Sequence, residues 1–397
     1  MSKLLKENHP VEAAQSLVPK LRERAQKTED SRKIPEETIK DLKEGGLFTM
    51  LRPKRYGGQE LNLRTYSEAV VEISRGCAST GWIVALCAIR ELMVAESFSE
   101  KTHQEIFGQN PEDVLFAGVY EPRKCVVKKV DGGYLIEEGF WMFCSGSLHA
   151  TWGYFGFPIY NEDGVMVDQK LMTVPFSELE IHDDWHTLGL RGTGSNSVTM
   201  TNVFVPDHRV TSFNEALNGN FESSHLRDIP LYHSALFPGL ILSLGLPGLG
   251  VLKNALDIFK EALPFRKAVH MGVEYVKDAA STHALLAEAT LKVETAEHYF
   301  YNLADEIDRW ANDKKYMERS ARVKALADIG YANKLLKEAL DLLLSGSGSG
   351  FVYNGHSMQR IIRDFLTLHS HRSLSPIITI ENYGRVLSGL ETNALRF

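Results

Sequence analysis

The spacing of apolar residues divides the chain into three regions. Up to about residue 110, and again from about residue 236, apolar side chains recur with the period of an amphipathic helix. Between about residues 114 and 210 the period shortens to two, in short runs rich in β-branched and aromatic residues. The pattern predicts helices, then a β region, then helices again.

The N-terminal region contains two readable helix starts. Thr65 and Glu68 have the spacing of a capping box ahead of an apolar helical segment. Residues 82–93 form an almost continuous apolar run, which predicts a helix buried inside a bundle. Ser79 or Thr80 precedes this run and is a suitable cap for it.

The β region consists of short strands without intervening helices, which favours an antiparallel barrel or sandwich. The expected strands are residues 114–120, 125–130, 134–143, 152–159, 164–167, 171–174 and 198–205. The expected domains are an N-terminal helical domain at 1–113, a β-domain at 114–212 and a C-terminal helical bundle at 213–397.

Two long helical segments, residues 273–311 and 320–344, dominate the C-terminal region and contain no proline. Helices of this length pack along one another, so we expect a bundle. Residues 345–350 then repeat Ser-Gly. That composition is typical of a flexible linker, although the exposed amides of such a loop can also bind a phosphate or a ring.

Composition and charge exclude several classes of protein. The chain has 397 residues, of which 44% are hydrophobic and 24% charged, as in a folded globular protein. Its net charge of −7 argues against nucleic-acid binding. The best membrane candidate, residues 82–89, is far shorter than the about 20 apolar residues that a span needs, so we expect no membrane segment.

Four cysteines, Cys77, Cys87, Cys125 and Cys144, lie far apart and form no Cys-x-x-Cys pair. They predict reduced thiols rather than a disulfide framework or a zinc site. The first twenty residues also lack the pattern of a signal peptide. Together these features predict a cytoplasmic protein.

Common catalytic and nucleotide-binding motifs do not occur in the sequence. We find no phosphate-binding loop and no nucleophile elbow. Gly245, Gly248 and Gly250 follow no predicted strand, so they do not form a dinucleotide-binding turn. His369 and His371 lack a third ligand at a suitable spacing, and we expect no metal site.

Three stretches combine residue types that occur in ligand sites. Residues 141–146 end a strand with aromatic side chains, a hydroxyl and a glycine, and residues 185–195 are rich in glycines and hydroxyls. Residues 363–371 contain an Arg-Asp pair and two histidines. Each stretch also has a purely structural interpretation: a core strand meeting a turn, a glycine-rich turn, and a surface ion pair beside solvated histidines.

Taken together, the order of the regions and these motifs resemble the acyl-CoA dehydrogenase superfamily over residues 14–386. The matching motifs are Arg52-Pro53 with Tyr56-Gly57-Gly58, residues 188–195, and Arg363-Asp364. The resemblance implies an α+β fold with an N-terminal helical domain, a central antiparallel β-barrel or sandwich, and a C-terminal four-helix bundle.

Two positions argue against a dehydrogenase within this superfamily. The family's dehydrogenases remove a substrate proton with a glutamate, and its place is taken here by Arg372, which is no base at neutral pH. The alternative place for that glutamate falls in residues 237–242, which contain no acid. A FAD oxidoreductase of the acyl-CoA dehydrogenase type with another base stays an alternative, as does a non-catalytic family member.

The chain more closely resembles the two-component flavin-dependent monooxygenases of this fold, such as the oxygenase components for 4-hydroxyphenylacetate, steroid-ring phenols and dibenzothiophene. The resemblance rests on residues 77–82, 143–146, 193–195 and on His371, eight residues after Arg363. It implies hydroxylation of a small aromatic or heteroatom-containing molecule by O2 and reduced flavin, FMN or FAD, through a C4a-hydroperoxyflavin. It also implies a separate NAD(P)H-dependent flavin reductase and a homotetramer.

The resemblance assigns roles to individual residues. Ser145 and His371 are the catalytic candidates, Ser145 near the flavin N5 and His371 beside the bound oxygen or the substrate hydroxyl. The expected cofactor-binding residues are Trp82, Trp141, Phe143, Cys144, Ser145, Trp185, Thr193, Ser195, Arg266, Ser349, Gly350, His371 and Arg372. Arg266 matches an arginine that reaches the flavin phosphate, and residues 349–350 match a loop that often acts across a subunit boundary.

Arg90 departs from the family pattern, because several relatives have a histidine at or beside this position. An arginine suits an anionic substrate group, and the structural alternative is an ion pair with Glu91 or another acid. His149 is a second candidate substrate contact, with a solvated loop histidine as its alternative.

Overall fold

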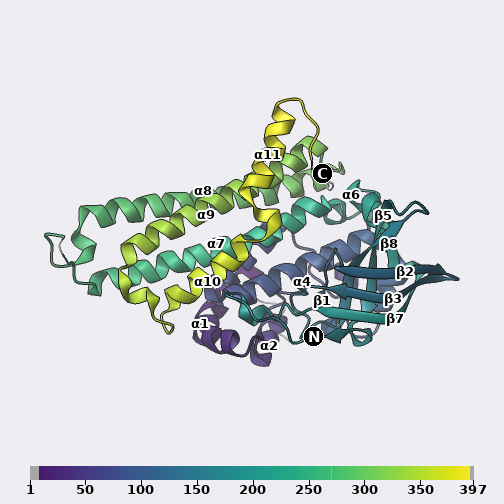
Figure 1. The fold of residues 1–397 in the computed structure, drawn as a ribbon, viewed down its shortest axis with the longest axis horizontal. Coiled ribbons are helices and arrows are strands. Elements are labelled where there is room, and N and C mark those ends of the chain that lie inside the picture. The colour runs from purple at the N-terminus through teal and green to yellow at the C-terminus, as the bar shows by residue number, and fades with distance from the viewer. Residues whose placement is uncertain (1–8, 270, 394–397) are drawn as a thin grey trace.

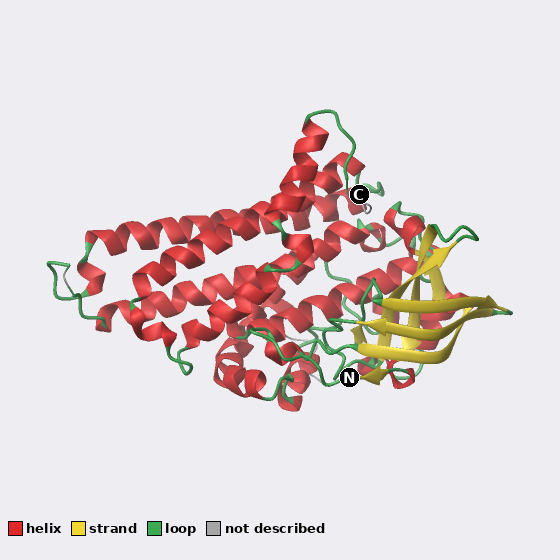
Figure 2. Cartoon of the chain, in the orientation of Figure 1, coloured by secondary structure: helices red, strands yellow, loops and turns green. Residues whose placement is uncertain are grey.

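A computed structural model describes residues 9–269 and 271–393 of the chain. Long helices form an elongated body, and the strands gather at one end of it, as Figures 1 and 2 show. The first eight residues, part of the segment in which we recognised no signal peptide, lie outside the described residues.

Of the five N-terminal helices, only the third begins at a side-chain cap. Their bounds are α1 (Pro10–Asp30), α2 (Glu36–Glu44), α3 (Leu63–Gly76), α4 (Ala78–Ser97) and α5 (Glu100–Phe107). The predicted capping box is wrong by three residues: Asn62 is the cap of α3, and its side chain accepts a hydrogen bond of 2.9 Å from the Thr65 amide. Glu68 instead pairs with Arg64, one turn earlier.

Helix α4 confirms the predicted buried helix but is longer than expected. It begins directly after Cys77, so the expected cap at Ser79 or Thr80 is wrong. Its two charged residues at 90 and 91 are both paired: Arg90 donates to the Gly118 carbonyl, and Glu91 pairs with Arg52 at 2.7 Å. Two segments of the described chain, α4 and Leu236–Phe265, are long and apolar enough to cross a membrane. Their most apolar stretches are 100% and 94% buried inside the protein, as expected for core helices.

The described strands form two four-stranded sheets, ordered β1-β4-β5-β8 and β2-β3-β7-β6. Their bounds are β1 (Phe116–Ala117), β2 (Lys124–Val130), β3 (Gly133–Trp141), β4 (Trp152–Tyr160), β5 (Met166–Pro175), β6 (Glu180–Ile181), β7 (Val198–Pro206) and β8 (Val210–Ser212). The pairings are antiparallel except for the parallel pair of β1 and β4. Most buried apolar residues of the strands form a core of their own, whereas Phe116, Tyr154 and Leu171 join the core of the helices. The central, mainly antiparallel sheets confirm the predicted β region of the fold.

The C-terminal helices form the predicted bundle. Their bounds are α6 (Phe213–Leu217), α7 (Leu236–Ala262), α8 (Ala280–Asn312), α9 (Arg319–Ser347), α10 (Ser357–His369) and α11 (Pro376–Leu387). Helices α7, α8, α9 and α10 run alongside one another in Figure 1, while α11 turns away from them.

Glycines in α7 allow close contacts with helices of both helical regions. A Cβ at Gly250 would lie 2.3 Å from the Val71 carbonyl oxygen in α3, and one at Gly245 would lie 2.4 Å from the Phe300 ring in α8. These glycines therefore serve close helix contacts, and one apolar core runs through both helical regions.

The Ser-Gly repeat at residues 345–350 is not a linker along its whole length. Helix α9 continues to Ser347, because the hydroxyls of Ser345 and Ser347 bond to backbone carbonyls one turn earlier, at 2.7 and 2.6 Å. The chain leaves the helix at Gly348, whose φ of 66° suits glycine.

Candidate functional site

A chain of buried hydroxyls connects α4 to the glycine-rich segment. The indole nitrogen of Trp82 donates to Ser145 Oγ at 2.9 Å, and Ser145 Oγ lies 2.7 Å from Ser195 Oγ. Ser195 Oγ in turn lies 2.6 Å from Thr193 Oγ1. The structure therefore brings together four of the residues that the sequence singled out, and all four are buried.

The direction of each hydrogen bond in this chain follows from its two ends. Thr193 donates its only hydroxyl proton to the Leu190 carbonyl at 2.8 Å, so it must accept a proton from Ser195. The proton of Ser195 is then used, and Ser145 must donate to Ser195. Because Trp82 can only donate, Ser145 accepts from it and keeps one free lone pair. Ser145 can thus accept, but not donate, one further hydrogen bond.

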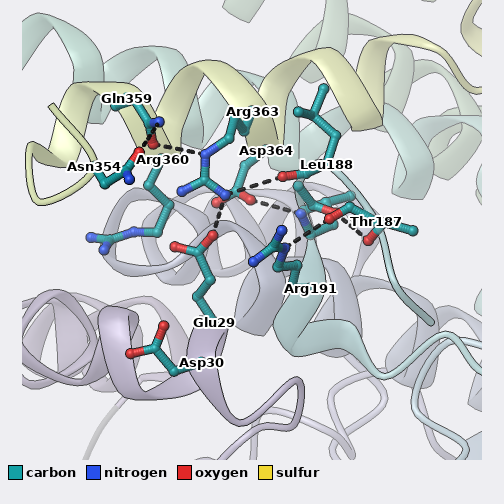
Figure 3. Close-up of polar contacts among 12 residues, drawn as sticks. Glu29, Asp30, Thr187, Leu188, Arg191, Asn354, Gln359, Arg360, Arg363 and Asp364 are labelled. Carbon is teal, nitrogen blue, oxygen red and sulfur yellow. Dashed lines mark hydrogen bonds and ion pairs between the residues drawn. The ribbon is translucent and has the colours of Figure 1, made fainter. Parts of the chain in front are cut away.

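Helix α10 holds the glycine-rich segment in place (Figure 3). The Asp364 carboxylate accepts a hydrogen bond of 2.7 Å from the Leu190 amide. Arg363 donates to the Leu188 carbonyl at 3.1 Å and also contacts Glu29 of α1. The Arg-Asp pair is therefore an anchor for the segment and not a surface ion pair.

The contact between this segment and α10 requires a glycine. A Cβ at Gly189 would lie 2.1 Å from the Arg363 carbonyl oxygen, and the next residue, Leu190, has a left-handed φ of 51°. Burial raises the pKa of Asp364 to about 6, while its bond to Leu190 acts in the opposite direction. Asp364 is thus ionised at neutral pH, which strengthens the bond that fixes the segment.

Aromatic rings surround the hydroxyl chain. The Trp185 indole donates to the Leu190 carbonyl at 3.0 Å, and Phe143 meets Trp185 edge-on at 6.0 Å between ring centroids. Phe143 has a φ of 67° and is 54% exposed, so its ring stands at the rim of the site. Such rings can cover a flat ligand and exclude water from it.

His371 lies beside Trp82, with 6.2 Å between the ring centroids. Its Nδ1 accepts a hydrogen bond of 3.3 Å from the Ser373 amide, so the proton of the neutral ring is on Nε2. Burial lowers the pKa of His371 to about 4, which keeps the ring neutral near pH 7. His369 stacks on Phe365 of its own helix, and Arg372 is exposed.

Trp141 and Cys144 were expected to contact the cofactor, but their side chains lie in the core of the β region. The Trp141 side chain is buried between the sheets, where its indole donates to the Gly156 carbonyl at 2.9 Å. Cys144 is buried in the same core, and burial raises its thiol pKa to about 12. Neither side chain takes part in the hydroxyl chain, although the Cys144 amide, which donates to the Asn196 carbonyl, helps to position Ser145.

Arg266, Ser349 and Gly350 form a second group at the far end of the bundle. Arg266 Nη2 lies 3.2 Å from the place of a Cβ on Gly348, so the guanidinium sits against the Ser-Gly turn. Ser349 and Gly350 are exposed there. In Figure 1 the loop after α7 is at the left end and the sheets are at the right, so one chain does not bring this group to Ser145.

Arg90 and His149 occupy separate surroundings. Arg90 is buried and donates to the Gly118 carbonyl at 2.7 Å, and it makes no ion pair with Glu91. His149 Nδ1 lies 4.0 Å from a carboxylate oxygen of Glu36, and burial lowers the His149 pKa to about 4. His149 is therefore not a solvated loop histidine.

Sequence reasoning missed two residues that position the site. Glu29 of α1 forms an ion pair with Arg363 of α10. The Asn196 side chain accepts a hydrogen bond of 3.1 Å from the Trp185 amide. Asn196 follows Ser195 directly, so its place in the glycine-rich segment was the available signal. The site as a whole offers an acceptor at Ser145, a donor at His371 Nε2 and aromatic walls, which suits a flat ring that carries an N–H group.

Comparisons with known proteins add independent findings. The family models of the acyl-CoA dehydrogenase N-terminal and C-terminal domains match residues 11–105 and 242–376. The oxygenase subunit HsaA of a flavin-dependent monooxygenase from Rhodococcus jostii (strain RHA1) is 32% identical over 94% of this chain and 97% of that protein. The oxygenase component of p-hydroxyphenylacetate 3-hydroxylase from Acinetobacter baumannii is 26% identical over 96% and 89%. The solved structure of XiaF from Streptomyces sp. in complex with FADH2 and glycerol has a TM-score of 0.91 at 27% identity, covering 98% of this chain and 97% of that one.

Proposed function

The chain belongs to the flavin-dependent monooxygenase oxygenase subunits of the acyl-CoA dehydrogenase fold, as its motifs predicted, and we propose that it is the oxygenase component of a two-component system. Its substrates are O2, reduced FMN or FAD supplied by a separate NAD(P)H-dependent reductase, and a small aromatic or heteroatom-containing molecule that it hydroxylates. Relatives named as oxygenase subunits or components support the dependence on a reductase.

The orientation of the Ser145 hydroxyl carries this proposal. Ser145 keeps one lone pair and has no proton left to donate, because its proton is held by Ser195. The flavin N5 bears a hydrogen in the reduced ring and is an acceptor in the oxidised ring. A site with Ser145 at N5 therefore favours reduced flavin, which supplies the electrons and the position at which O2 is activated.

The remaining residues of the site protect and direct that chemistry. Trp82, Trp185 and Phe143 cover the ring and keep water away from it. His371 presents its Nε2 proton and can donate a hydrogen bond to an oxygen bound beside Trp82. The hydroxyl chain itself contains no carboxylate, which agrees with an oxygenase and provides no base for a dehydrogenase.

The second group of residues supports a homotetramer. No acid among the described residues acts on Arg266, whose pKa is lowered by burial alone, and it lies beside the exposed Ser349 and Gly350. Exposed apolar side chains flank this group, with Phe265 at 83% and Tyr353 at 74% exposure. We propose that Arg266 binds the flavin phosphate of a neighbouring subunit, whose ring lies at Ser145. A stable, active monomer in light scattering would refute this arrangement.

The cysteines and the long helices bear on the cellular setting of the protein. Cys77, Cys87, Cys125 and Cys144 are all free thiols in the structure, which supports a reducing, cytoplasmic compartment. The buried long helices support a protein that does not insert into membranes. We propose domains at 1–113, 114–212 and 213–397, because the chain changes from helices to strands and back near these boundaries.

The test of the proposed function measures binding of the two flavin redox states and coupling to product. Reduced flavin, added without oxygen, should raise the melting temperature more than oxidised flavin does. With a flavin reductase, NADH and a set of phenols, at least one phenol should be hydroxylated in proportion to the flavin consumed. Equal effects of both flavins, together with no product from any phenol, would refute the proposal.

A further inference from the structure

Several buried polar atoms at the junction of α4 and the sheet β1-β4-β5-β8 have no hydrogen-bond partner among the described residues. They are Arg90 Nη1, Glu96 Oε2, Ser97 Oγ, the Tyr154 hydroxyl and Thr173 Oγ1. Each of these residues is at least nine-tenths buried. Native proteins rarely leave such groups unpaired, so several of them together indicate a place for a polar ligand.

These atoms come from elements that meet at one place. Tyr154 and Thr173 are directly paired between β4 and β5, so their side chains share one face of the sheet. That face packs on α4, because the Tyr154 ring meets Phe98 edge-on at 6.0 Å. Arg90 reaches the same place through its bond to the Gly118 carbonyl, since a Cβ on Gly118 would lie 1.8 Å from the Tyr154 carbonyl oxygen.

The junction carries an uncompensated positive charge. The guanidinium of Arg90 carries a full positive charge. Glu91 is bound by Arg52 with hydrogen bonds of 2.7 and 2.9 Å and is not available to Arg90. Burial raises the pKa of Glu96 well above its usual value, which disfavours its charged form, and its carboxyl oxygen Oε1 already accepts a hydrogen bond from the Ser234 amide. A buried cation without a counter-charge is costly, and a bound anion removes that cost.

The Tyr154 hydroxyl can stabilise an anion at the junction only by donating a hydrogen bond to it. Burial raises the pKa of the Tyr154 phenol well above its usual value, so the phenol keeps its proton. Arg90 Nη1 and the Tyr154 hydroxyl have no well-formed hydrogen bond to the described residues. Ser97 is the nearest polar side chain that acts on the Tyr154 phenol, and Arg90 also acts on it through its charge. A carboxylate, with two acceptor oxygens and one negative charge, satisfies both donors.

We propose that this junction binds the carboxylate of an aromatic acid, with Arg90 and Tyr154 as its donors, so that the substrate of the proposed monooxygenase is anionic. That the bound acid is a substrate rests on the proposed function, whereas the position of the binding site rests on the geometry of the junction. Arg90 follows Trp82 by two helical turns, about 12 Å along α4. Cys87 lies between them, with its sulfur 3.7 Å from the place of a Cβ on Gly146. An acid held at Arg90 therefore extends its ring towards Ser145.

The first experiment compares acids with their neutral amides in binding alone. The probes are 4-hydroxybenzoate, 4-hydroxyphenylacetate and 4-hydroxycinnamate, each paired with its primary amide, titrated calorimetrically with and without reduced flavin under anaerobic conditions. A charge-assisted pair predicts that at least one acid binds about 10- to 150-fold more tightly than its amide. Equal affinities within every pair would overturn the inference.

Substitutions then assign the preference to the two donors. Arg90→Met should abolish the preference for the acid and raise the melting temperature of the ligand-free protein, because it removes an unpaired buried charge. Tyr154→Phe should weaken the preference about 3- to 10-fold. Arg55→Met, which removes an exposed ion pair with Glu100, is the matched control and should leave the preference unchanged.

The outcomes separate this inference from the proposed function. If Arg90→Met keeps the preference, or if it lowers stability while Tyr154→Phe has no effect, Arg90 is structural and the inference fails. Hydroxylation of neutral phenols with no preference for acids would also refute it, and the proposed function would stand. If acids bind through Arg90 but reduced flavin does not raise the melting temperature, the proposed function fails and the carboxylate site at the junction stands.

Discussion

The oriented hydroxyl chain makes Ser195→Ala the most informative substitution in the site. In the native protein the Ser145 proton is held by Ser195, across 2.7 Å, and Ser195 is itself held by Thr193 across 2.6 Å. Alanine at 195 removes this acceptor, and the Ser145 hydroxyl becomes free to turn its proton towards a ligand. Ser145 can then donate to an unprotonated nitrogen, which the native arrangement prevents.

The expected consequence is a change in the preference between two redox states of flavin. A hydrogen bond of this kind contributes about 0.5–1.5 kcal/mol. The variant should lose part of one bond to reduced flavin and gain one to oxidised flavin, so the difference in binding free energy should shrink by about 1–3 kcal/mol. This corresponds to a decrease of about 5- to 150-fold in the ratio of the two affinities.

The assay is a pair of titrations, with oxidised flavin in air and with reduced flavin under anaerobic conditions. Ser147→Ala is the matched control, because Ser147 is also buried and bonds to the Gly194 carbonyl at 3.0 Å without touching Ser145. The control should keep the native ratio of affinities. An unchanged ratio in Ser195→Ala would show that the proton of Ser145 is not directed as the hydrogen bonds indicate.

Three further predictions test the site and the buried histidines. Ser145→Ala should divert oxygen to hydrogen peroxide and lower product per flavin consumed by about 5- to 150-fold, and an unchanged ratio of product to peroxide would exclude Ser145 from the reaction. His371→Ala should lower coupled hydroxylation about 100-fold or more, and His369→Ala much less, since its ring stacks on its own helix; the reverse order would mean that the residue match is shifted by two. Burial lowers the pKa of His149 to about 4, so the unfolded chain binds its proton first as the pH falls from about 6.5. In the native protein this lowers the free energy of unfolding by up to about 1.4 kcal/mol for each pH unit between about 6.5 and 4. His149→Gln removes this contribution, so the stability of the variant should fall less steeply with pH. Parallel stability profiles of the two proteins would show that His149 is not held neutral by burial.

Hydrophobic period was enough to predict the order of elements, but not how polar residues within them are paired. Residues 164–167 and 171–174 were expected as two strands and are one, β5. The polar residues 168–170 between them continue the ladder opposite residues 157–159 of β4. The sequence shows which residues are polar, whereas pairing with a neighbouring strand depends on the tertiary fold.

The site could be predicted residue by residue but not as an arrangement. Resemblance identified Ser145, Thr193 and Ser195 separately, and only the structure shows that they share their protons in one direction. The resemblance placed both Trp141 and Phe143 on the ligand. Strand β3 ends at Trp141, and the positive φ of Phe143 turns its ring out to the rim while Trp141 stays in the core.

Arg90 shows why neighbours in sequence predict ion pairs poorly on a helix. Consecutive residues of an α-helix point about 100° apart, so Arg90 and Glu91 cannot face one another. Glu91 turns to Arg52, and Arg90 turns to the Gly118 carbonyl at the edge of the sheet. The acid that was the simplest structural partner for Arg90 is thus part of a different contact. The two neighbouring charges therefore have separate roles: Glu91 joins α4 to the loop before α3, and Arg90 is free to bind the proposed carboxylate.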